Sequence, residues 1–599
     1  MAPDAPTHYR VSLADVNAHV FEVRCDVCQP APDGQRFRLP TWVPGSYLIR
    51  EFARHFVDIR AESGGASVAL VKEAKDTWRA APCPGPLSIV AKVYAFDLSV
   101  RTAYLDSRRA YFNGGALFLC PEGHESDACT LEIILPGREP FLAWRCATTL
   151  PRTGDGLQFR ADNYDALIDH PVELSDFTPG EFSAGGVPHE LAITGQHDAD
   201  LPRLERDLAR VCQSHVDLFG GPPPFSRYLF QVMAVGEGYG GLEHRSSTSL
   251  LASRNGLPAP GMEEPTDAYV NFLGLASHEY FHAWNVKRIK PAAFTPYDLS
   301  GESYTRQLWA FEGITSYYDD LALVRSRVIG ASKYLELVGR AVTSVLRTPG
   351  RHVQSVAASS FDAWIKFYRP DENSPNAGVS YYLKGSLIAL ALDLLLRSEE
   401  RGSLDDVMRV LWRRYGKTGV GVPEDGFAAA VAEVAGRGFD EFFSRYVDGS
   451  EDPPLAVLLA SHGISLVLRR VGGASDRGGK PATAGTEARN SIGAKVGSDL
   501  RLQHVFSGGP AEEAGLAPGD TLVALDGVRA SQDVLATVLE RLPDGARIGV
   551  HAFRRDELMT FTLTPRAAPL DTAFLAIDAD ATAENRRRLS AWLGTTGPL

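Results

Sequence analysis

The five residues His278-Glu279-Tyr280-Phe281-His282 constrain this chain more than any other feature. On a helix the two histidines lie one turn apart on the same face, so both imidazoles can reach one metal ion. Glu279 lies beside the first histidine and can hold a water molecule rather than the metal. Glu312, in the run Trp-Ala-Phe-Glu-Gly, offers a carboxylate from a second helix as a third ligand. Three protein ligands and one open position are typical of catalytic zinc, whereas structural zinc usually has four protein ligands.

The alternative is an ordinary amphipathic helix whose histidines are half-buried or face solvent. The apolar run 272–277 leads into the motif, and residues 313–319 after Glu312 form a second apolar and aromatic helical pattern. Both helices are therefore expected to be buried, where histidine and glutamate side chains need partners. A shared metal ion meets that need, and we expect one zinc ion as the cofactor.

Composition limits the classes of partner. The chain has 599 residues, enough for about three or four domains. Its formal net charge is −13 and no strongly basic stretch occurs, which argues against nucleic acid or an anionic membrane as the main partner. No apolar run reaches the roughly eighteen residues that a membrane span needs. The seven cysteines show no framework spacing, and the first residues lack a signal-peptide pattern. We expect a cytoplasmic protein, or a periplasmic one if a signal peptide has been removed.

Hydrophobic periodicity divides the chain. Residues 1–172 alternate apolar and polar positions over short runs, which predicts an all-β, sandwich-like domain. Residues 173–455 include a helical pattern at 201–219 and a strand at 228–235, and helices dominate from about 270 onward. Residues 456–567 begin with a short strand and contain a Gly- and Ser-rich stretch at 472–491 that predicts a flexible loop. Residues 568–599 are expected to pack back on the rest through apolar side chains.

The motifs together resemble the glycyl aminopeptidase family, which comprises PDZ-containing gluzincin zinc metallopeptidases with a thermolysin-like catalytic domain. The similar segments are residues 278–291 and 309–318, with further likeness at 42–54, 239–244 and 382–385. Residues 508–527 are similar to bacterial PDZ domains. The resemblance covers nearly the whole chain, and it implies a multidomain fold: an N-terminal β domain, a mainly α-helical thermolysin-like peptidase domain and a C-terminal PDZ-like β/α domain. Taken without the family, segment 42–52 is interpreted as a structural corner.

The resemblance also implies roles for particular residues. Glu279 would be the catalytic base and Tyr382 the donor to the oxyanion, with Tyr381 as its rival. Glu243 would bind the α-ammonium group of the substrate, and the backbone of Gly240 and Gly241 would pair with the substrate as an added strand.

The chain departs from its broader aminopeptidase relatives at two points. His244 and Leu242 stand where those relatives have asparagine and methionine, and the segment between His282 and Glu312 is longer. Asp319, two helical turns after the third zinc ligand, is the candidate partner for the second ring nitrogen of His278.

Three functions remain open on this basis. The first is a zinc aminopeptidase that releases small N-terminal residues, glycine and alanine, from peptides with a free N-terminus. The second is a zinc endopeptidase on the same scaffold, which would have no use for an amine anchor at Glu243. The third is a PDZ-type peptide-binding protein with weak peptidase activity. The PDZ-like domain itself could bind a peptide C-terminus or pack against the catalytic domain, and no sequence feature decides between these.

Overall fold

The computed structural model describes residues 6–483, 485–543 and 545–595. Residues 1–5, residue 484 of the predicted loop and residues 596–599 of the predicted tail lie outside the described residues. The chain separates into two compact units, one made of Met1–Ser303 with Trp412–Gly421 and the other of Tyr304–Leu411 with Val422–Leu599. The domain boundaries drawn from the sequence stay predictions. Among the described helices, none combines the length and the apolar character needed to cross a bilayer.

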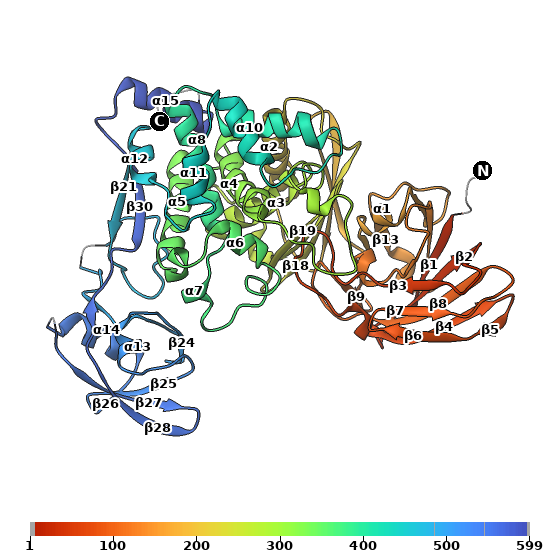
Figure 1. Ribbon diagram of the computed structural model, residues 1–599, viewed down its shortest axis with the longest axis horizontal. Helices are drawn as coiled ribbons and strands as arrows, with labels where there is room; N and C mark the ends of the chain where they lie inside the picture. Colours follow the sequence, from red (N-terminus) through yellow and green to blue (C-terminus); the bar gives the residue numbers. More distant parts are fainter. Residues whose placement is uncertain (1–5, 484, 544, 596–599) are drawn as a thin grey trace. The chain divides into compact units, whose positions relative to one another are not determined.

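The N-terminal region is rich in β-strands, as predicted (Figure 1). Alternate residues of its first strands are buried, the pattern of strands with one face in a core. Side chains from three sheets share one buried cluster, as in a sandwich. The largest sheet has the order β14 (Gln158–Ala161), β12 (Cys129–Ile134), β1 (Thr7–Asp15), β2 (Val20–Val27), β8 (Leu87–Tyr94), β4 (Phe56–Ser63) and β5 (Ala66–Val68). The second has the order β13 (Arg145–Ala147), β15 (Val172–Ser175), β10 (Arg109–Phe112) and β9 (Ala103–Leu105). The third has the order β11 (Cys120–Pro121), β3 (Arg36–Arg38), β7 (Thr77–Ala80) and β6 (Leu70–Ala74).

A five-stranded sheet follows in the same unit. Its order is β16 (Thr178–Ala184), β17 (Val187–Thr194), β18 (Tyr228–Val235), β20 (Ser247–Ser253) and β19 (Tyr239–Glu243), so β19 is an edge strand. Helix α2 (Leu201–Phe219) connects β17 to the parallel strand β18, and helix α3 (Asp267–Phe281) carries the histidine motif. Leu242 of β19 belongs to the buried cluster of the N-terminal sheets. Because successive side chains of a strand alternate, Gly241 and Glu243 share the opposite face.

The second unit begins with helices, as predicted. A π-helical turn, η6 (Trp309–Gly313), leads directly into α4 (Ile314–Arg325). The further helices are α5 (Ala331–Leu346), α6 (Val356–Phe361), α7 (Ser374–Ala377), α8 (Leu383–Ser398), α9 (Leu404–Leu411), α10 (Gly426–Ala435), α11 (Asp440–Tyr446) and α12 (Leu455–Ala460). α8 is buried along most of its length and contacts η6, α4 and α5, so it is the centre of the helical part.

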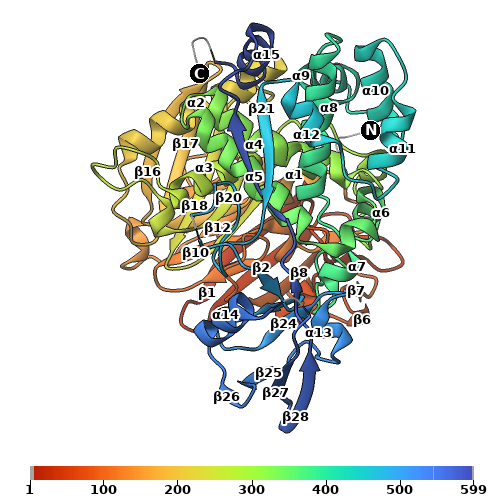
Figure 2. The same cartoon turned by 90° about the vertical axis from the view of Figure 1, so that its left-hand side faces the viewer.

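Strands β21 (Ile464–Arg469) and β30 (Thr572–Ile577) form an antiparallel pair (Figure 1 and Figure 2). Along the chain, β21 precedes the C-terminal module and β30 follows it. The module has its own buried cluster. It consists of the sheet β26 (Val528–Arg529), β25 (Thr521–Leu525), β27 (Ile548–Arg554), β28 (Glu557–Leu563), the pairs β22 (Asn490–Ser491) with β29 (Arg566–Ala567) and β23 (Ala494–Val496) with β24 (Leu502–Val505), and helices α13 (Pro510–Glu513) and α14 (Gln532–Arg541). After β30 the last helix is α15 (Ala583–Leu593). Its residues Leu589, Trp592 and Leu593 are buried.

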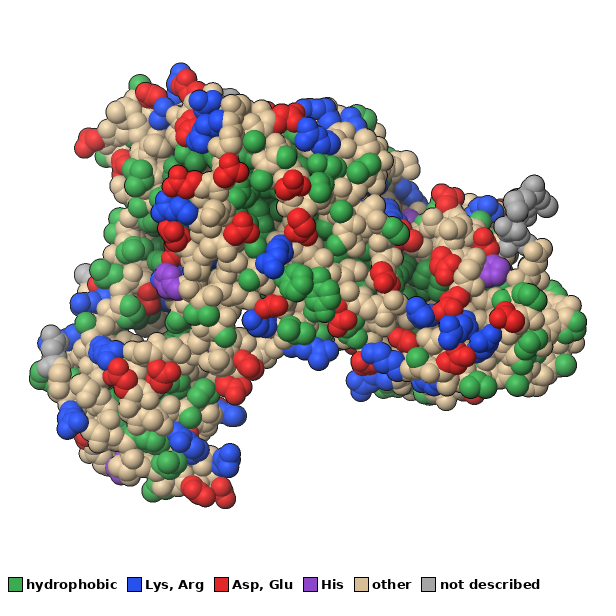
Figure 3. Space-filling view, viewed as in Figure 1, with side chains coloured by type: hydrophobic (Ala, Val, Ile, Leu, Met, Phe, Trp, Pro, Cys, Tyr) green, Lys and Arg blue, Asp and Glu red, His purple; other side chains and the backbone are tan. Residues whose placement is uncertain are grey.

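The segment before the module has little regular structure, and its first part is anchored. Asp476 pairs with Arg469 at 2.5 Å, and the backbone N–H of Gly479 donates to the carbonyl of Ala573. On the face seen in Figure 3, Lys and Arg side chains stand interspersed with Asp and Glu. This distribution agrees with the absence of a basic stretch in the sequence.

Candidate metal centre and active site

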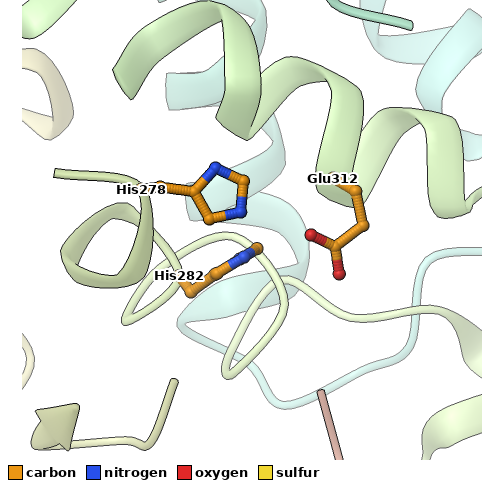
Figure 4. Close-up of side chains that lie close together, drawn as sticks. All are labelled: His278, His282 and Glu312. Atoms are coloured by element: carbon orange, nitrogen blue, oxygen red, sulfur yellow. The ribbon is translucent and has the colours of Figure 1, made fainter. Parts of the chain in front are cut away.

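The three predicted zinc ligands converge. One ligand atom each from His278, His282 and Glu312 lies within 4.8 Å of the others (Figure 4). The two imidazole rings have centroids 4.7 Å apart and are nearly perpendicular, at 87°. Two imidazole nitrogens and one carboxylate oxygen are a donor set that zinc takes in catalytic sites, with one position left for water or substrate. The residues therefore fit a zinc ion by their chemistry and their mutual distance.

The backbone around His282 sets the orientation of its ring. It follows the last residue of α3, and its side chain is almost fully buried. Its Nδ1 lies 2.7 Å from the carbonyl oxygen of Asn285. A carbonyl only accepts, so Nδ1 carries the hydrogen in this pair, and the lone pair of the neutral ring is on Nε2. Metal-binding histidines are commonly held in this way through the nitrogen that does not bind the metal.

Glu312 lies in the π-helical turn η6 rather than in a regular α-helix. Single π-helical turns occur mostly inside α-helices and frequently at functional sites. The next residue, Gly313, packs against α8: a Cβ added there would lie 2.7 Å from the Cα of Gly385. Two glycines facing each other thus let the start of α8 approach the segment that carries Glu312.

This approach explains the Tyr-Tyr-Leu-Lys-Gly run at the start of α8. Gly385 provides the close contact, and the buried ammonium group of Lys384 donates to the carbonyls of Arg351 at 3.0 Å and Ser450 at 2.8 Å. Burial lowers the pKa of Lys384, with Asp452 acting in the opposite direction. The two residues therefore fix the position of the tyrosines that precede them.

Tyr381 and Tyr382 have different surroundings. Tyr381 is fully buried, and burial raises the pKa of its hydroxyl well above the usual range, with Tyr368 and Glu312 adding to the effect. Tyr382 is half-buried, and its hydroxyl lies 3.0 Å from that of Tyr368. Tyr368 was not singled out from the sequence, and no periodicity or motif marks it. Of the two candidate oxyanion donors, only Tyr382 is partly exposed to solvent.

Glu279 and the edge strand are in direct contact. The Glu279 side chain is 5% exposed. A Cβ added at Gly241 would overlap the Glu279 carboxylate, so a larger residue at this position of β19 would displace that side chain. One ligand-type atom each from Glu243, Glu279 and His282 also lies within 4.8 Å of the others. The predicted base, the predicted amine anchor and one predicted zinc ligand therefore meet at one point.

Glu243 is buried against the N-terminal β region. Its Oε1 has no hydrogen-bond partner among the described residues. Gly45 lies directly against the carboxylate, because an added Cβ would overlap both carboxylate oxygens. The interpretation of segment 42–52 as a structural corner is therefore incomplete, since its Pro-Gly turn also forms one wall of the site. The turn was recognisable from sequence, but its neighbour almost 200 residues away was not.

Behind Glu243 lies a buried charge network. The Lys287 ammonium is 2.6 Å from Asp169, and Nδ1 of His244 is 3.5 Å from the same carboxylate. Burial alone would raise the pKa of Asp169, but Lys287 and Arg245 outweigh it and hold that pKa well below its usual range. Burial lowers the pKa of His244, with Asp169 acting in the opposite direction. The residue that departs from the relatives' asparagine is thus part of a network around Asp169.

Asp319 is half-buried on α4, and its Oδ1 accepts the backbone N–H of Asp320 at 2.6 Å. Its pairing with His278 stays a prediction.

Comparison with known proteins identifies the family. The family models for the M61 peptidase N-terminal domain and for M61 glycyl aminopeptidase match residues 8–176 and 271–388. The crystal structure of an aminopeptidase N family protein from Idiomarina loihiensis is 40% identical, covers 98% of this chain and 100% of its own, and has a TM-score of 0.93. An M1 zinc metallopeptidase from Deinococcus radiodurans is 16% identical and covers 76% of this chain and 95% of its own, with a TM-score of 0.47.

No protein in the curated set matches. Identity of 40% over almost the whole length, together with the two family models, shows that the chain belongs to the M61 glycyl aminopeptidase family of zinc metallopeptidases.

Proposed function

We propose that this chain is a zinc-dependent aminopeptidase that releases small N-terminal residues, glycine and alanine, from peptides. The observation that carries the proposal is the meeting of Glu243, Glu279 and His282 within 4.8 Å. A buried carboxylate oxygen of Glu243 without a hydrogen-bond partner among the described residues suits an incoming ammonium group. Only a substrate with a free amino terminus can supply that group.

The proposed chemistry uses these side chains in sequence. His278, His282 and Glu312 would hold the zinc ion, which when bound would supply a Lewis acid for the scissile carbonyl and would lower the pKa of water. Glu279 accepts the proton of the attacking water and delivers it to the leaving amine. Tyr382 donates its hydroxyl hydrogen to the oxyanion that develops on the substrate.

Glu243 fixes which bond is cut. Pairing with the α-ammonium group leaves room for one residue between the amine and the reacting carbonyl. The Gly45 turn against both carboxylate oxygens limits the space beside that amine, which supports a preference for glycine and alanine. An endopeptidase would gain nothing from a buried carboxylate beside its catalytic base with one oxygen, Oε1, that has no hydrogen-bond partner among the described residues, so this observation favours the aminopeptidase.

The test is hydrolysis of glycyl, alanyl and leucyl anilides beside their N-acetylated counterparts, with and without a zinc chelator. We expect chelator-sensitive cleavage of the free-amine substrates alone, fastest for glycine or alanine. Glu243→Gln should lose most of its kcat/KM, whereas Glu237→Gln, at an exposed position of the same sheet region, should not. Equal cleavage of acetylated substrates would support the endopeptidase instead, and fastest cleavage of leucine would refute the size preference.

The finer organisation is also proposed. We infer that residues 456–567 form a PDZ-like domain. Two features support this: β23 pairs only with β24 among the described strands, and the side-chain amide of Gln532, at the start of α14, donates to the carbonyl of Gly497 at 2.6 Å. An extended peptide could add to the free edge of β23 and place its terminal carboxylate at the Ser491–Gly493 turn. Fluorescent peptides that differ only in a free or amidated C-terminus test this, and equal binding would refute it.

The seven cysteines are unpaired, which supports a reducing, cytoplasmic compartment.

A further inference from the structure

Arg101, in the loop between β8 and β9, reaches the edge strand beside the active site. Its Nη2 donates to the carbonyl oxygen of Gly241 at 2.9 Å. Its Nη1 lies 3.8 Å from the point that a Cβ on Gly240 would occupy. Nη2 is the only nitrogen of this guanidinium with a side-chain hydrogen bond to a described residue, and Nε is buried without a partner. The group therefore has unused donors beside Gly240 and Gly241 of the edge strand.

The loop is held in place from three directions. The Tyr111 hydroxyl bridges the carbonyl of Val100 at 2.7 Å and the hydroxyl of Ser249 on β20 at 3.0 Å. The backbone N–H of Asn113 donates to Thr102 at 2.8 Å, and that of Arg101 itself lies 3.3 Å from the hydroxyl of Ser99. The backbone around Arg101 is thus held against the sheet to which Gly241 and Glu243 belong, and the bond to the Gly241 carbonyl directs the guanidinium to β19.

The spacing along β19 sets what such a group can meet. Gly241 and Glu243 are two residues apart on an edge strand, which corresponds to about 7 Å. An extended dipeptide spans about the same length between its amine and its carboxylate. With its ammonium group at Glu243 and its chain along β19, a dipeptide would bring its carboxylate to Arg101. The two charges of the site would then match the two charges of the zwitterionic substrate.

We propose that Arg101 binds the C-terminal carboxylate of short substrates and makes dipeptides the preferred substrate class. The proposal rests on the proposed aminopeptidase function, because it uses the amine anchor at Glu243. A guanidinium paired with a carboxylate forms charge-assisted hydrogen bonds, which are about twice as strong as neutral ones. Longer peptides offer Arg101 only a neutral carbonyl, and their C-terminal residues pass beyond it.

The experiment compares Ala-Ala, Ala-Ala amide and alanyl anilide as substrates of the full chain. For the wild type, kcat/KM should be higher for the free acid than for the amide by about tenfold or more, as expected for one charge-assisted pair. Arg101→Met should abolish this preference through KM of the acid, while the anilide and the amide change by about twofold or less. Arg101→Lys should retain part of the preference, because it keeps the charge and loses the fork. Arg108→Met, an exposed arginine of the neighbouring hairpin, is the matched control.

The outcomes separate this proposal from the function on which it rests. A wild type that cleaves the anilide but treats acid and amide alike overturns the role of Arg101 and leaves the aminopeptidase intact. Equal losses on all three substrates in Arg101→Met would also overturn it, since they would show that Arg101 only supports β19. Calorimetric binding of Ala-Ala and its amide to Glu279→Gln repeats the comparison without turnover. A wild type that cleaves no free-amine substrate, with no acid preference in binding, would overturn both.

Discussion

At the scale of single residues, two carboxylates of the candidate site occupy space that is open only because two neighbouring residues are glycines. The carboxylate of Glu279 lies where a side chain at Gly241 would be, and the carboxylate of Glu243 lies where a side chain at Gly45 would be. The side chains of the proposed base and the proposed amine anchor are thus in close contact with backbone that only glycine leaves open. Substitution of either glycine should act on the neighbouring carboxylate first.

Gly45→Ala should raise KM for free-amine anilides by about tenfold or more, because the new methyl group displaces one partner of a charge-assisted contact. Gly45 also has φ of +95°, so backbone strain adds a loss of stability. Gly64→Ala is the control, because Gly64 has φ of +59° and open space at its Cβ. Steady-state kinetics and thermal unfolding of both variants separate the two effects. A rise of KM in both variants would show that strain alone is responsible.

Lys287→Met should lower the free energy of unfolding by about 3 to 5 kcal/mol, because it leaves Asp169 buried without its nearest cation. Lys366→Met is the control: this lysine pairs with Asp362 at 2.8 Å, but it is half exposed, and such pairs contribute about 1 kcal/mol or less. Urea unfolding at pH 7 measures both variants. A loss in Lys287→Met no larger than that of the control would contradict the prediction.

The carboxylate of Asp169 also determines how stability changes with pH. The pKa of Asp169 is lowered in the folded chain, so its contribution to stability is complete above its unfolded value of about 4 and is lost as the pH falls toward the folded value. Without Lys287 the folded pKa rises, and the acid-unfolding midpoint of Lys287→Met should move to higher pH. Circular dichroism during acid titration measures this, and an unchanged midpoint would assign acid unfolding to other groups.

At the scale of elements, the candidate metal centre depends on the approach of α8 to η6. A Cβ at Gly385 would lie 3.0 Å from both the Cα of Gly313 and the carbonyl oxygen of Trp309. Both are backbone atoms of the turn that carries Glu312, so neither can yield without moving that turn. The position of one predicted zinc ligand is therefore coupled to the packing of a neighbouring helix.

Gly385→Ala should weaken zinc binding by about tenfold, the size of effect produced by changes in the support of a metal ligand. Competition with a chromophoric chelator measures the affinity without using activity. Ser386→Ala, one residue further along α8, removes only a local hydrogen bond to Leu383 and should leave the affinity unchanged. An unaltered affinity in Gly385→Ala would show that Glu312 is positioned independently of α8.

Local patterns were predicted well, and distant contacts were not. Helix 201–219 and strand 228–235 agree with α2 and β18, because hydrophobic periodicity is a local property. The wall that Gly45 forms beside Glu243 and the reach of Arg101 to Gly241 join segments 140 residues apart or more, and a single loop arginine has no pattern. The π-helical turn at Glu312 was also not predicted, since a sequence does not display its hydrogen-bond register.

At the scale of the whole molecule, the last described helix of the second unit, α15, packs against α4 of the same unit. The indole N–H of Trp592 donates to the hydroxyl of Tyr317 at 2.8 Å, and Arg325 donates to the carbonyl of Trp592 at 3.1 Å. Tyr317 and Arg325 both belong to α4, which continues directly from the turn of Glu312. Helix α15 thus stabilises the helix that follows a predicted ligand.

Trp592→Ala should lower the free energy of unfolding by about 3 to 5 kcal/mol, because a fully buried indole leaves a cavity. Trp592→Phe retains most of the packing and should lose about 1 kcal/mol from the missing hydrogen bond to Tyr317. Val457→Ala, at an apolar side chain that is 73% exposed, should change stability by about 0.5 kcal/mol or less. Chemical denaturation measures all three. Equal, small losses would mean that α15 docks only weakly.

The π-helical turn at Trp309–Gly313 limits where related chains can carry insertions or deletions. A π turn closes its hydrogen bonds over one residue more than an α turn, so it absorbs what is in effect a one-residue insertion. Deleting that residue would leave a regular helix that still folds, but every side chain on one side of the deletion would be rotated by about 100° relative to the other. Glu312 and the Tyr317 anchor would then no longer face their partners together. Between functional homologues, gaps in a sequence alignment should therefore avoid residues 309–317.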